Sequence, residues 1–342
     1  MKKAHAIILL ALLTACLASL AACTSGKGQP VDTDMPTNPD TDPAPTEAPT
    51  DTETEPETEP ETEPETEPLS LEEQAASLRE ILNTAEGGLT LTAFGGAEID
   101  AGALAPLGTE IDALEAKGKM VSFILIDIET GKGLAYNCDK PWTSQSTVKA
   151  PYLTSVLLDD PSVLKKEKAL YKAVITVSDN DAYETLRNRY GDVPFRAFCK
   201  SSGVSLRHTQ DLYPRSITVR DMAKLWTNMY VFLNTTDMTE YVSWFTGTAF
   251  SCIYQGLGDR CTVQTKAGWE SGTDEDSPYG TPAPRFVDGD PSNDETATND
   301  TGVIYADGHP YILALFTNLQ SDPPSLIPLV QAIDDAHTAL VK

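Results

Sequence analysis

The segment Thr24–Pro68 constrains the fold most, because it lacks the residues needed to build a core. It consists mainly of Thr, Glu, Asp and Pro and ends in the repeat TETEPETEPETEPETEP. With almost no aromatic or β-branched aliphatic residues to bury, it does not offset the entropy lost on ordering. Fourteen acidic residues stand against one lysine, so 13 of the 26 net negative charges lie here. We therefore expect residues 23–68 to form an extended stalk, reaching at most roughly 140 Å, and residues 69–342 to fold.

The N-terminus predicts export. Two lysines precede an apolar run, Ala6–Ala22, as in a secretory signal. The stretch Leu20-Ala21-Ala22-Cys23 resembles the lipobox of bacterial lipoproteins. This resemblance implies that residues 1–22 are removed and that Cys23 is lipidated, which would hold the protein on the outer face of the bacterial membrane, in the cell envelope. A looser match ending at Cys16 would leave too short an apolar run, and an ordinary signal-peptidase site with an incidental Cys23 remains the alternative.

The charge of the folded part excludes several partners. Residues 69–342 hold 37 acidic and 22 basic side chains, a balance of −15. Such a surface does not favour nucleic acid or an anionic membrane surface. We expect contact with the membrane through the lipid anchor only. The cysteine spacings do not match a zinc site, and we expect neither a metal nor a cofactor.

Four cysteines remain in the folded part: Cys138, Cys199, Cys252 and Cys261. Outside the membrane, disulfides can persist. Cys252 and Cys261 flank a short Gly-containing stretch, so we expect them to close a hairpin and leave Cys138 and Cys199 as the second pair. Four cysteines allow three connectivities, and the sequence alone does not choose among them.

Hydrophobic periodicity predicts an α+β fold. A capping box at Ser70 opens a first helix, which reaches about Thr84 and is followed by a glycine-rich connector. Strands at both ends of the chain surround a block of helices, so we expect an antiparallel sheet built from N- and C-terminal strands with a helical subdomain between them. Residues 69–108 then form a helix and connector, residues 109–342 the main domain, and 270–300 an acidic loop. Predicted helices are Thr109–Lys117, Ser146–Leu158, Lys165–Thr176, Asp181–Tyr190, Pro194–Ser202 and Thr218–Phe232. Predicted strands are Val121–Ile128, Leu134–Cys138, Cys261–Ala267, Gly302–Tyr305 and Tyr311–Asn318.

A Ser-x-x-Lys motif begins one of these helices. Ser146 follows a predicted hairpin, and at the start of a helix the backbone N–H groups can stabilise a developing oxyanion. Lys149 lies on the same helical face. Pro151 predicts an irregular first turn. A second Ser-x-x-Lys, at Ser162, lacks this context and is given no role.

Two further motifs follow in the chain. ITVSDN places Ser178 and Asn180 at the end of a predicted helix, and VQTKAGW places Lys266-Ala267-Gly268 at the end of a predicted strand. Each motif alone is ordinary. The three in this order, each on a suitable element, form a specific constellation.

From about Thr109 to Lys342 the chain resembles the class A β-lactamase-like family of the penicillin-recognising serine acyltransferases. The signature of that superfamily is Ser-x-x-Lys, Ser-x-Asn and Lys-Thr-Gly. The resemblance implies the β-lactamase/D,D-peptidase-like fold and roles for eight residues. Ser146 would be the acylated nucleophile, Lys149 its base, Ser178 the proton relay to the leaving nitrogen, Lys266 a catalytic cation, and Asn180, Ala267, Gly268 and Trp269 substrate-binding residues. A neutral Lys149 is required, and a facing Lys266 lowers its pKa. The oxyanion hole would be the backbone N–H groups of Ser146 and Trp269.

The sequence departs from the family at Ala267, where the family has Thr or Ser. That hydroxyl binds the carboxylate of a penicillin or of a terminal D-alanine. Its loss is expected to weaken carboxylate binding by roughly 1.5–3 kcal/mol. Thr265 is not expected to replace it, because strand residues two apart share a face and the adjacent residues Thr265 and Lys266 do not.

The second departure is the absence of Glu-x-x-Leu-Asn, whose glutamate activates the deacylating water in class A β-lactamases. Between Asn180 and Thr218 the one glutamate, Glu184, is wrongly placed. His208 and Asp211 lie in the shortened segment, where a loop role is expected over a water-activating one. Acylation is therefore expected and efficient hydrolysis is not.

The sequence supports a serine hydrolase or acyltransferase that reacts with β-lactams or D-Ala-D-Ala-type, peptidoglycan-derived peptides and deacylates slowly. The alternative is a catalytically degenerate lipoprotein that binds cell wall or a partner on the same fold. A solute-binding lipoprotein leaves the three motifs unexplained. An esterase for substrates other than β-lactams stays open because of Ala267.

Overall fold

The computed structural model describes residues 69–271 and 296–342. The predicted signal peptide (1–22), the stalk (23–68) and most of the acidic loop (270–300) lie outside these ranges. Among the helices within them, none combines the length and apolarity that crossing a bilayer requires.

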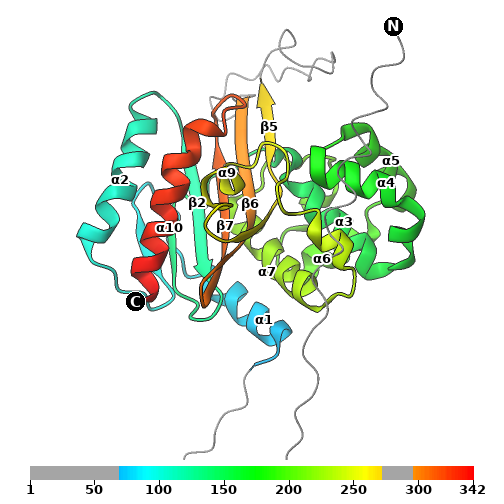
Figure 1. Cartoon of the computed structure of the whole chain (residues 1–342), viewed down its shortest axis with the longest axis horizontal. Coiled ribbons are helices and arrows are strands. Elements are labelled where there is room, and N and C mark those ends of the chain that lie inside the picture. The colour runs from blue at the N-terminus through cyan, green and yellow to red at the C-terminus, as the bar shows by residue number, and fades with distance from the viewer. Residues whose placement is uncertain (1–68, 272–295) are drawn as a thin grey trace, which may run out of the picture. The chain divides into compact units, whose positions relative to one another are not determined.

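A seven-stranded antiparallel sheet organises the fold, with strand order β1-β3-β2-β7-β6-β4 and with β5 paired to β6. The β2–β7 pair joins the N-terminal strands to the C-terminal ones, as predicted (Figure 1). The strands are β1 (Thr92–Phe94), β2 (Val121–Asp127), β3 (Gly133–Tyr136), β4 (Thr262–Thr265), β5 (Gly268–Ser271), β6 (Thr296–Ala306) and β7 (His309–Thr317).

Helices cover both faces of this sheet and enclose two hydrophobic cores. On one face lie α2 (Ala101–Glu115), α9 (Cys252–Leu257) and α10 (Ile327–Val341). On the other lie α1 (Leu71–Leu82), α3 (Lys149–Asp159), α4 (Ser162–Val177), α5 (Asn180–Tyr190), α6 (Val193–Ser201), α7 (Val219–Thr235) and α8 (Thr239–Ser243) (Figure 1). The predicted α+β fold, with a helical subdomain between the two sets of strands, is confirmed.

The central strand β2 shows why the sequence reads as continuously apolar there. Side chains alternate between the two faces of a strand. Ile124 and Ile126 enter the core beneath α7, whereas Val121, Phe123 and Leu125 enter the core beneath α2 and α10. An antiparallel strand covered on both faces loses the usual alternation of apolar and polar residues.

The connector predicted between residues 85 and 108 is more ordered than expected. Strand β1 pairs with β3, and α2 begins at Ala101, so a domain boundary at residue 109 falls inside a helix. The predicted capping box of α1 is present, with Ser70 and Glu73 bonded reciprocally. Helix α1 packs on α7. Residues 69–108 therefore belong to the same folded unit as the rest.

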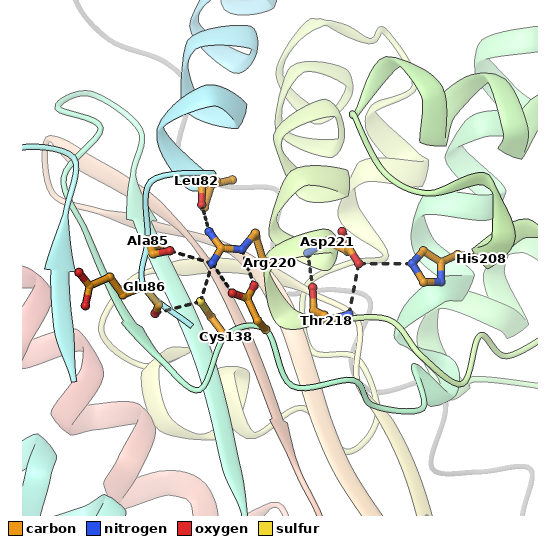
Figure 2. A network of polar contacts seen from close by, with 9 residues as sticks. Leu82, Ala85, Glu86, Cys138, His208, Thr218, Arg220 and Asp221 are labelled. Carbon is orange, nitrogen blue, oxygen red and sulfur yellow. Dashed lines mark hydrogen bonds and ion pairs between the residues drawn. The ribbon is translucent and has the colours of Figure 1, made fainter. Parts of the chain in front are cut away.

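A buried arginine ties α1 to the start of α7 (Figure 2). The guanidinium of Arg220 donates to the carbonyl oxygens of Leu82 and Ala85 and to the carboxylate of Asp139. Carbonyls at a helix C-terminus lack partners within the helix, and a cation satisfies them well. This contact explains how the end of α1 is fixed over the sheet.

The predicted disulfides are absent from the structure, in which all four cysteines of the described residues are free thiols. Cys252 begins the helix α9, so the segment to Cys261 is not a hairpin. Cys138 instead donates to the carbonyl of Glu86 at 3.4 Å and contacts Arg220 (Figure 2), while Cys199 is buried on α6. Both predicted pairings, Cys252–Cys261 and Cys138–Cys199, are therefore wrong.

We predict that alkylation of the denatured, unreduced protein labels the thiols of Cys138, Cys199, Cys252 and Cys261. The physical reason is that each side chain is packed in its own part of the core or at its edge. Peptide mapping before and after reduction should give the same four labelled peptides. A cross-linked peptide that disappears on reduction would contradict the structure.

Candidate active site

The turn that carries Ser146 is a short 3-10 helix, η1 (Gln145–Val148), which leads directly into α3. The irregular first turn that Pro151 predicts is thus observed. Gln145 has a positive φ of 48°, a conformation that costs free energy for a non-glycine residue. Such a conformation persists only where its surroundings fix it.

Three contacts hold this turn in place. Trp142 bridges to Ile217, the backbone N–H of Ser144 donates to the carbonyl of Pro214 at 2.7 Å, and the side-chain amide of Asn299 on β6 donates to the carbonyl of Thr143 at 3.0 Å. The Ser146 turn is therefore fastened both to the sheet and to the segment between α6 and α7.

Gly268 brings strand β5 against the same turn. A Cβ atom at this position would lie 2.5 Å from the backbone nitrogen of Ser146 and 2.8 Å from that of Thr147. No side chain fits there, so only glycine permits the approach. The backbone that leads from Gly268 into Trp269 consequently runs alongside the Ser146 turn.

Two lysines converge on the hydroxyl of Ser178. Its Oγ lies 3.3 Å from Nζ of Lys149 and 3.0 Å from Nζ of Lys266. Ser178 follows the last residue of α4 in the left-handed conformation, with φ 63° and ψ 32°. This strained position directs its hydroxyl between the two amines.

Lys149 makes further contacts with the same motif. Its Nζ donates to the carbonyl of Ser178 at 2.7 Å and to Oδ1 of Asn180 at 2.5 Å. The structure therefore brings together Lys149, Ser178, Asn180 and Lys266, four of the residues predicted for the site. Gly268 lies against the turn of Ser146, and Ala267 and Trp269 flank that glycine.

Burial lowers the pKa of both lysines, because an ammonium ion loses its hydration in the interior. Lys149 and Lys266 are each 0% exposed. Burial, followed by repulsion from Lys266, lowers the pKa of Lys149 to about 6 against a smaller opposing effect of Asp179. Burial lowers the pKa of Lys266 to about 7, and the carboxylate of Asp300 opposes it. At neutral pH Lys149 is thus mainly a neutral amine.

Asp300, on β6, supplies a buried negative charge behind Lys266. Its carboxylate accepts hydrogen bonds from the hydroxyl of Ser251 at 2.7 Å and from two backbone N–H groups, those of Ile253 and Thr301. Burial raises its pKa to about 6 despite these bonds. At neutral pH the carboxylate is mostly ionised and favours the charged form of Lys266.

The hydroxyl of Thr265 is engaged away from the lysines. Its Oγ1 lies 2.9 Å from Oγ of Ser251 and 2.9 Å from Oγ1 of Thr248. This agrees with the expectation that Thr265 does not substitute for the hydroxyl missing at Ala267.

The segment that follows α6 reaches the site with an aromatic residue. His208 is buried in η2 (Leu206–Thr209), with Nε2 3.3 Å from the carboxylate of Asp221 on α7 (Figure 2), and Asp211 is exposed. Tyr213, by contrast, donates its hydroxyl to Oδ1 of Asn180 at 2.9 Å. Burial raises the pKa of Tyr213, so the phenol stays protonated at neutral pH. Tyr213 was not among the predicted site residues.

A sequence profile described as the β-lactamase enzyme family matches residues 165–337, half of the chain. The match covers Ser178, Asn180 and Lys266 and begins after Lys149. No curated protein matches the sequence.

Two solved structures share the fold. A β-lactamase from Streptosporangium roseum is 19% identical and superposes with a TM-score of 0.50 over 70% of this chain and 100% of that one. A class A β-lactamase from Clostridium kluyveri is 18% identical, with a TM-score of 0.50 and the same coverage of the two chains. These likenesses concern the arrangement of helices and strands.

We predict that Asp300→Asn lowers the pKa of Lys266 further, because the substitution removes the negative charge that opposes the effect of burial. The pKa is measured by NMR titration of the lysine side-chain Cε–H signals, with Lys266→Arg to assign the resonance. Asp307→Asn, which removes an exposed carboxylate from the β6–β7 turn, is the matched control. An unchanged or raised Lys266 pKa in Asp300→Asn would contradict this electrostatic account.

Proposed function

Since the chain belongs to the β-lactamase enzyme family, we propose that it is a penicillin-recognising serine acyltransferase in which Ser146 forms an acyl-enzyme with β-lactams or D-Ala-D-Ala-type peptides. The observation that carries this proposal is the pair of buried lysines around the Ser178 hydroxyl, beside the Ser146 turn. A nucleophilic serine needs an adjacent base that is neutral when it acts. Lys149, with its pKa near 6, meets that requirement.

The first step of the proposed reaction is attack of the Ser146 oxygen on the substrate carbonyl. The serine proton passes to the lone pair of neutral Lys149. The two N–H groups of this amine can continue to donate hydrogen bonds to the carbonyl of Ser178 and to Oδ1 of Asn180. The tetrahedral oxyanion is stabilised by the backbone N–H groups of Ser146 and Trp269, which donate to charge that develops in the transition state.

The second step breaks the carbon–nitrogen bond of the substrate. The leaving nitrogen takes a proton from the Ser178 hydroxyl, and the hydroxyl recovers one from the Lys149 ammonium, 3.3 Å away. The products are an ester of Ser146 and a neutral amine, and Lys149 returns to its starting state. Lys266, 3.0 Å from the same oxygen, supplies the positive charge that attracts the substrate carboxylate.

Deacylation is proposed to be slow. In the part of the chain that the structure describes, the segment between α6 and α7 brings Tyr213, rather than a carboxylate, to Asn180. A protonated phenol is a poor general base at neutral pH. His208, the other candidate for activating a water, has its Nε2 atom 3.3 Å from the carboxylate of Asp221. The acyl-enzyme is therefore expected to accumulate.

The envelope location is a proposal that rests on the sequence alone. Lipidation of Cys23 would tether the enzyme to the outer face of the membrane, and the acidic stalk would let it reach peptidoglycan-derived peptides. The degenerate binding lipoprotein is the competing proposal, and Ala267 favours it to the extent that carboxylate recognition is weakened.

We predict a persistent covalent adduct on the parent protein with benzylpenicillin or a cephalosporin. When the β-lactam ring opens, the leaving nitrogen stays attached to the acyl group. Intact-protein mass spectrometry should therefore show a mass increase equal to that of the whole penicillin. Ser146→Ala should show none, while Ser162→Ala, in the other Ser-x-x-Lys, should behave as the parent. The proposal fails if neither several β-lactams nor peptide thioesters label the parent, or if Ser146→Ala is labelled equally.

We predict that Ala267→Ser increases acylation by carboxylate-bearing β-lactams about ten- to a hundredfold, since it restores a charge-assisted hydrogen bond worth roughly 1.5–3 kcal/mol. The second-order acylation rate constant is measured by the growth of the adduct. Methyl esters of the same compounds are the control, because they lack the carboxylate and should gain little. An equal gain for acid and ester would show that the hydroxyl acts in another way.

A further inference from the structure

Phe250 occupies an unfavourable position by two measures. Its side chain is 42% exposed, and its φ is 60°, in the left-handed region. This conformation is sterically unfavourable for a bulky residue, whereas glycine and asparagine adopt it more readily. Leu158 and Val193 are also exposed, but they lie within helices and have ordinary backbone angles, and the exposed Leu69, Leu89 and Leu212 are not among the residues with positive φ. Neither the exposure of the ring nor the positive φ stabilises the fold, so we look for a functional reason for Phe250 at this position.

Hydrogen bonds on both sides fix the strained residue. The backbone N–H of Ala249 donates to the carbonyl of Thr176 at 2.9 Å, two residues before Ser178. Ser251 donates to the Asp300 carboxylate, which lies behind Lys266. The loop is thus fastened to α4, which Ser178 follows, and to β6, which carries the Asp300 carboxylate behind Lys266. Backbone strain held in this way is found mainly at functional sites.

The ring of Phe250 lies flat on that of Trp269. Their centroids are 4.3 Å apart and their planes differ by 15°. Trp269 follows Gly268, whose backbone lies against the Ser146 turn. The centroid of the Trp269 ring is also 5.9 Å from Nζ of Lys266. The stacked rings therefore border the reacting centre on the side of Lys266.

The position beside Lys266 assigns the rings to one part of the substrate. In the proposed function Lys266 attracts the carboxylate, which belongs to the leaving part of a D-Ala-D-Ala-type peptide. The hydroxyl that would assist it is missing at Ala267, and an exposed aromatic surface lies nearby. Contact between the substrate and an aromatic ring contributes binding free energy. This contribution offsets part of the binding free energy that is lost with the weakened carboxylate contact.

Resting on the proposed function, we propose that Phe250 and Trp269 form an aromatic subsite for the leaving part of the acyl donor. The subsite binds a flat apolar group next to the carboxylate that Lys266 attracts. The favoured substrates are then peptides or esters whose terminal residue is aromatic instead of D-alanine. The rings take no part in proton transfer. Their role is to determine which leaving group the site prefers.

The test uses two esters that share one acyl group, hippuryl-D-lactate and hippuryl-D-phenyllactate, which differ by a phenyl ring in the leaving part. Acylation rate constants are measured on the full chain and on Phe250→Gly, which accepts the positive φ and removes the ring. The preference for the phenyllactate ester should fall roughly three- to tenfold in Phe250→Gly. Phe250→Tyr should retain it, and Val193→Ala, an exposed change on α6, should leave it unaltered.

Binding separates this proposal from the acylation mechanism. In the Ser146→Ala background, ligand-observed NMR titration gives the dissociation constants of both esters without any reaction. A phenyl preference that disappears with Phe250→Gly supports the subsite even if the parent forms no acyl-enzyme. An unchanged preference in Phe250→Gly, or no phenyl preference in the parent, would overturn the subsite even if Ser146 is acylated. Failure of both esters to bind would overturn it as well.

Discussion

The burial of two lysines around one serine hydroxyl is the constraint on which the rest of the site depends. Two ammonium ions cannot both stay charged in a dry interior at close range, because each loses hydration and repels the other. The structure resolves this by an asymmetry: Asp300 favours the charged form of Lys266, while Lys149 is left with the lower pKa. The amine beside the Ser146 turn is the mainly neutral one, as the proposed acyl transfer requires.

The fold maintains this arrangement by fastening strained segments to a rigid sheet. Gln145, Ser178 and Phe250 all have positive φ. Gln145 lies in the Ser146 turn, Ser178 between the two lysines, and Phe250 on the ring of Trp269. Strain of this kind is retained only where surrounding contacts outweigh it. Strand β6 supplies many of those contacts, since it pairs with β4, β5 and β7 and carries Asp300. A site built on such elements is positioned before the substrate arrives.

The sequence predicted the elements that carry long periodic patterns and missed those that tertiary contacts create. Helices α4 to α7 and the central strands were located because their apolar residues repeat regularly. Strand β1 has only three residues and owes its form to pairing with β3. Helix α10 was missed although Leu329, Ile333, Ala336 and Leu340 recur at helical spacing, so its signal was present.

The disulfides were mispredicted because the spacing of cysteines in the sequence does not determine where their side chains point in the fold. Tyr213 was missed because a short irregular segment gives no pattern, and its contact with Asn180 exists only after the chain has folded.

The pH dependence of acylation at Ser146 tests the central claim most directly. The base must be neutral, so the rate should be low while Lys149 is protonated and should rise with pH through its pKa of about 6. Because Lys266 contributes to that low value, Lys266→Met should move the rise to higher pH, as the pKa of Lys149 increases without the neighbouring cation. A parent profile that rises only toward the ordinary lysine pKa near 10.4, or a rise that Lys266→Met does not shift, would contradict a neutral Lys149 held by its buried neighbour.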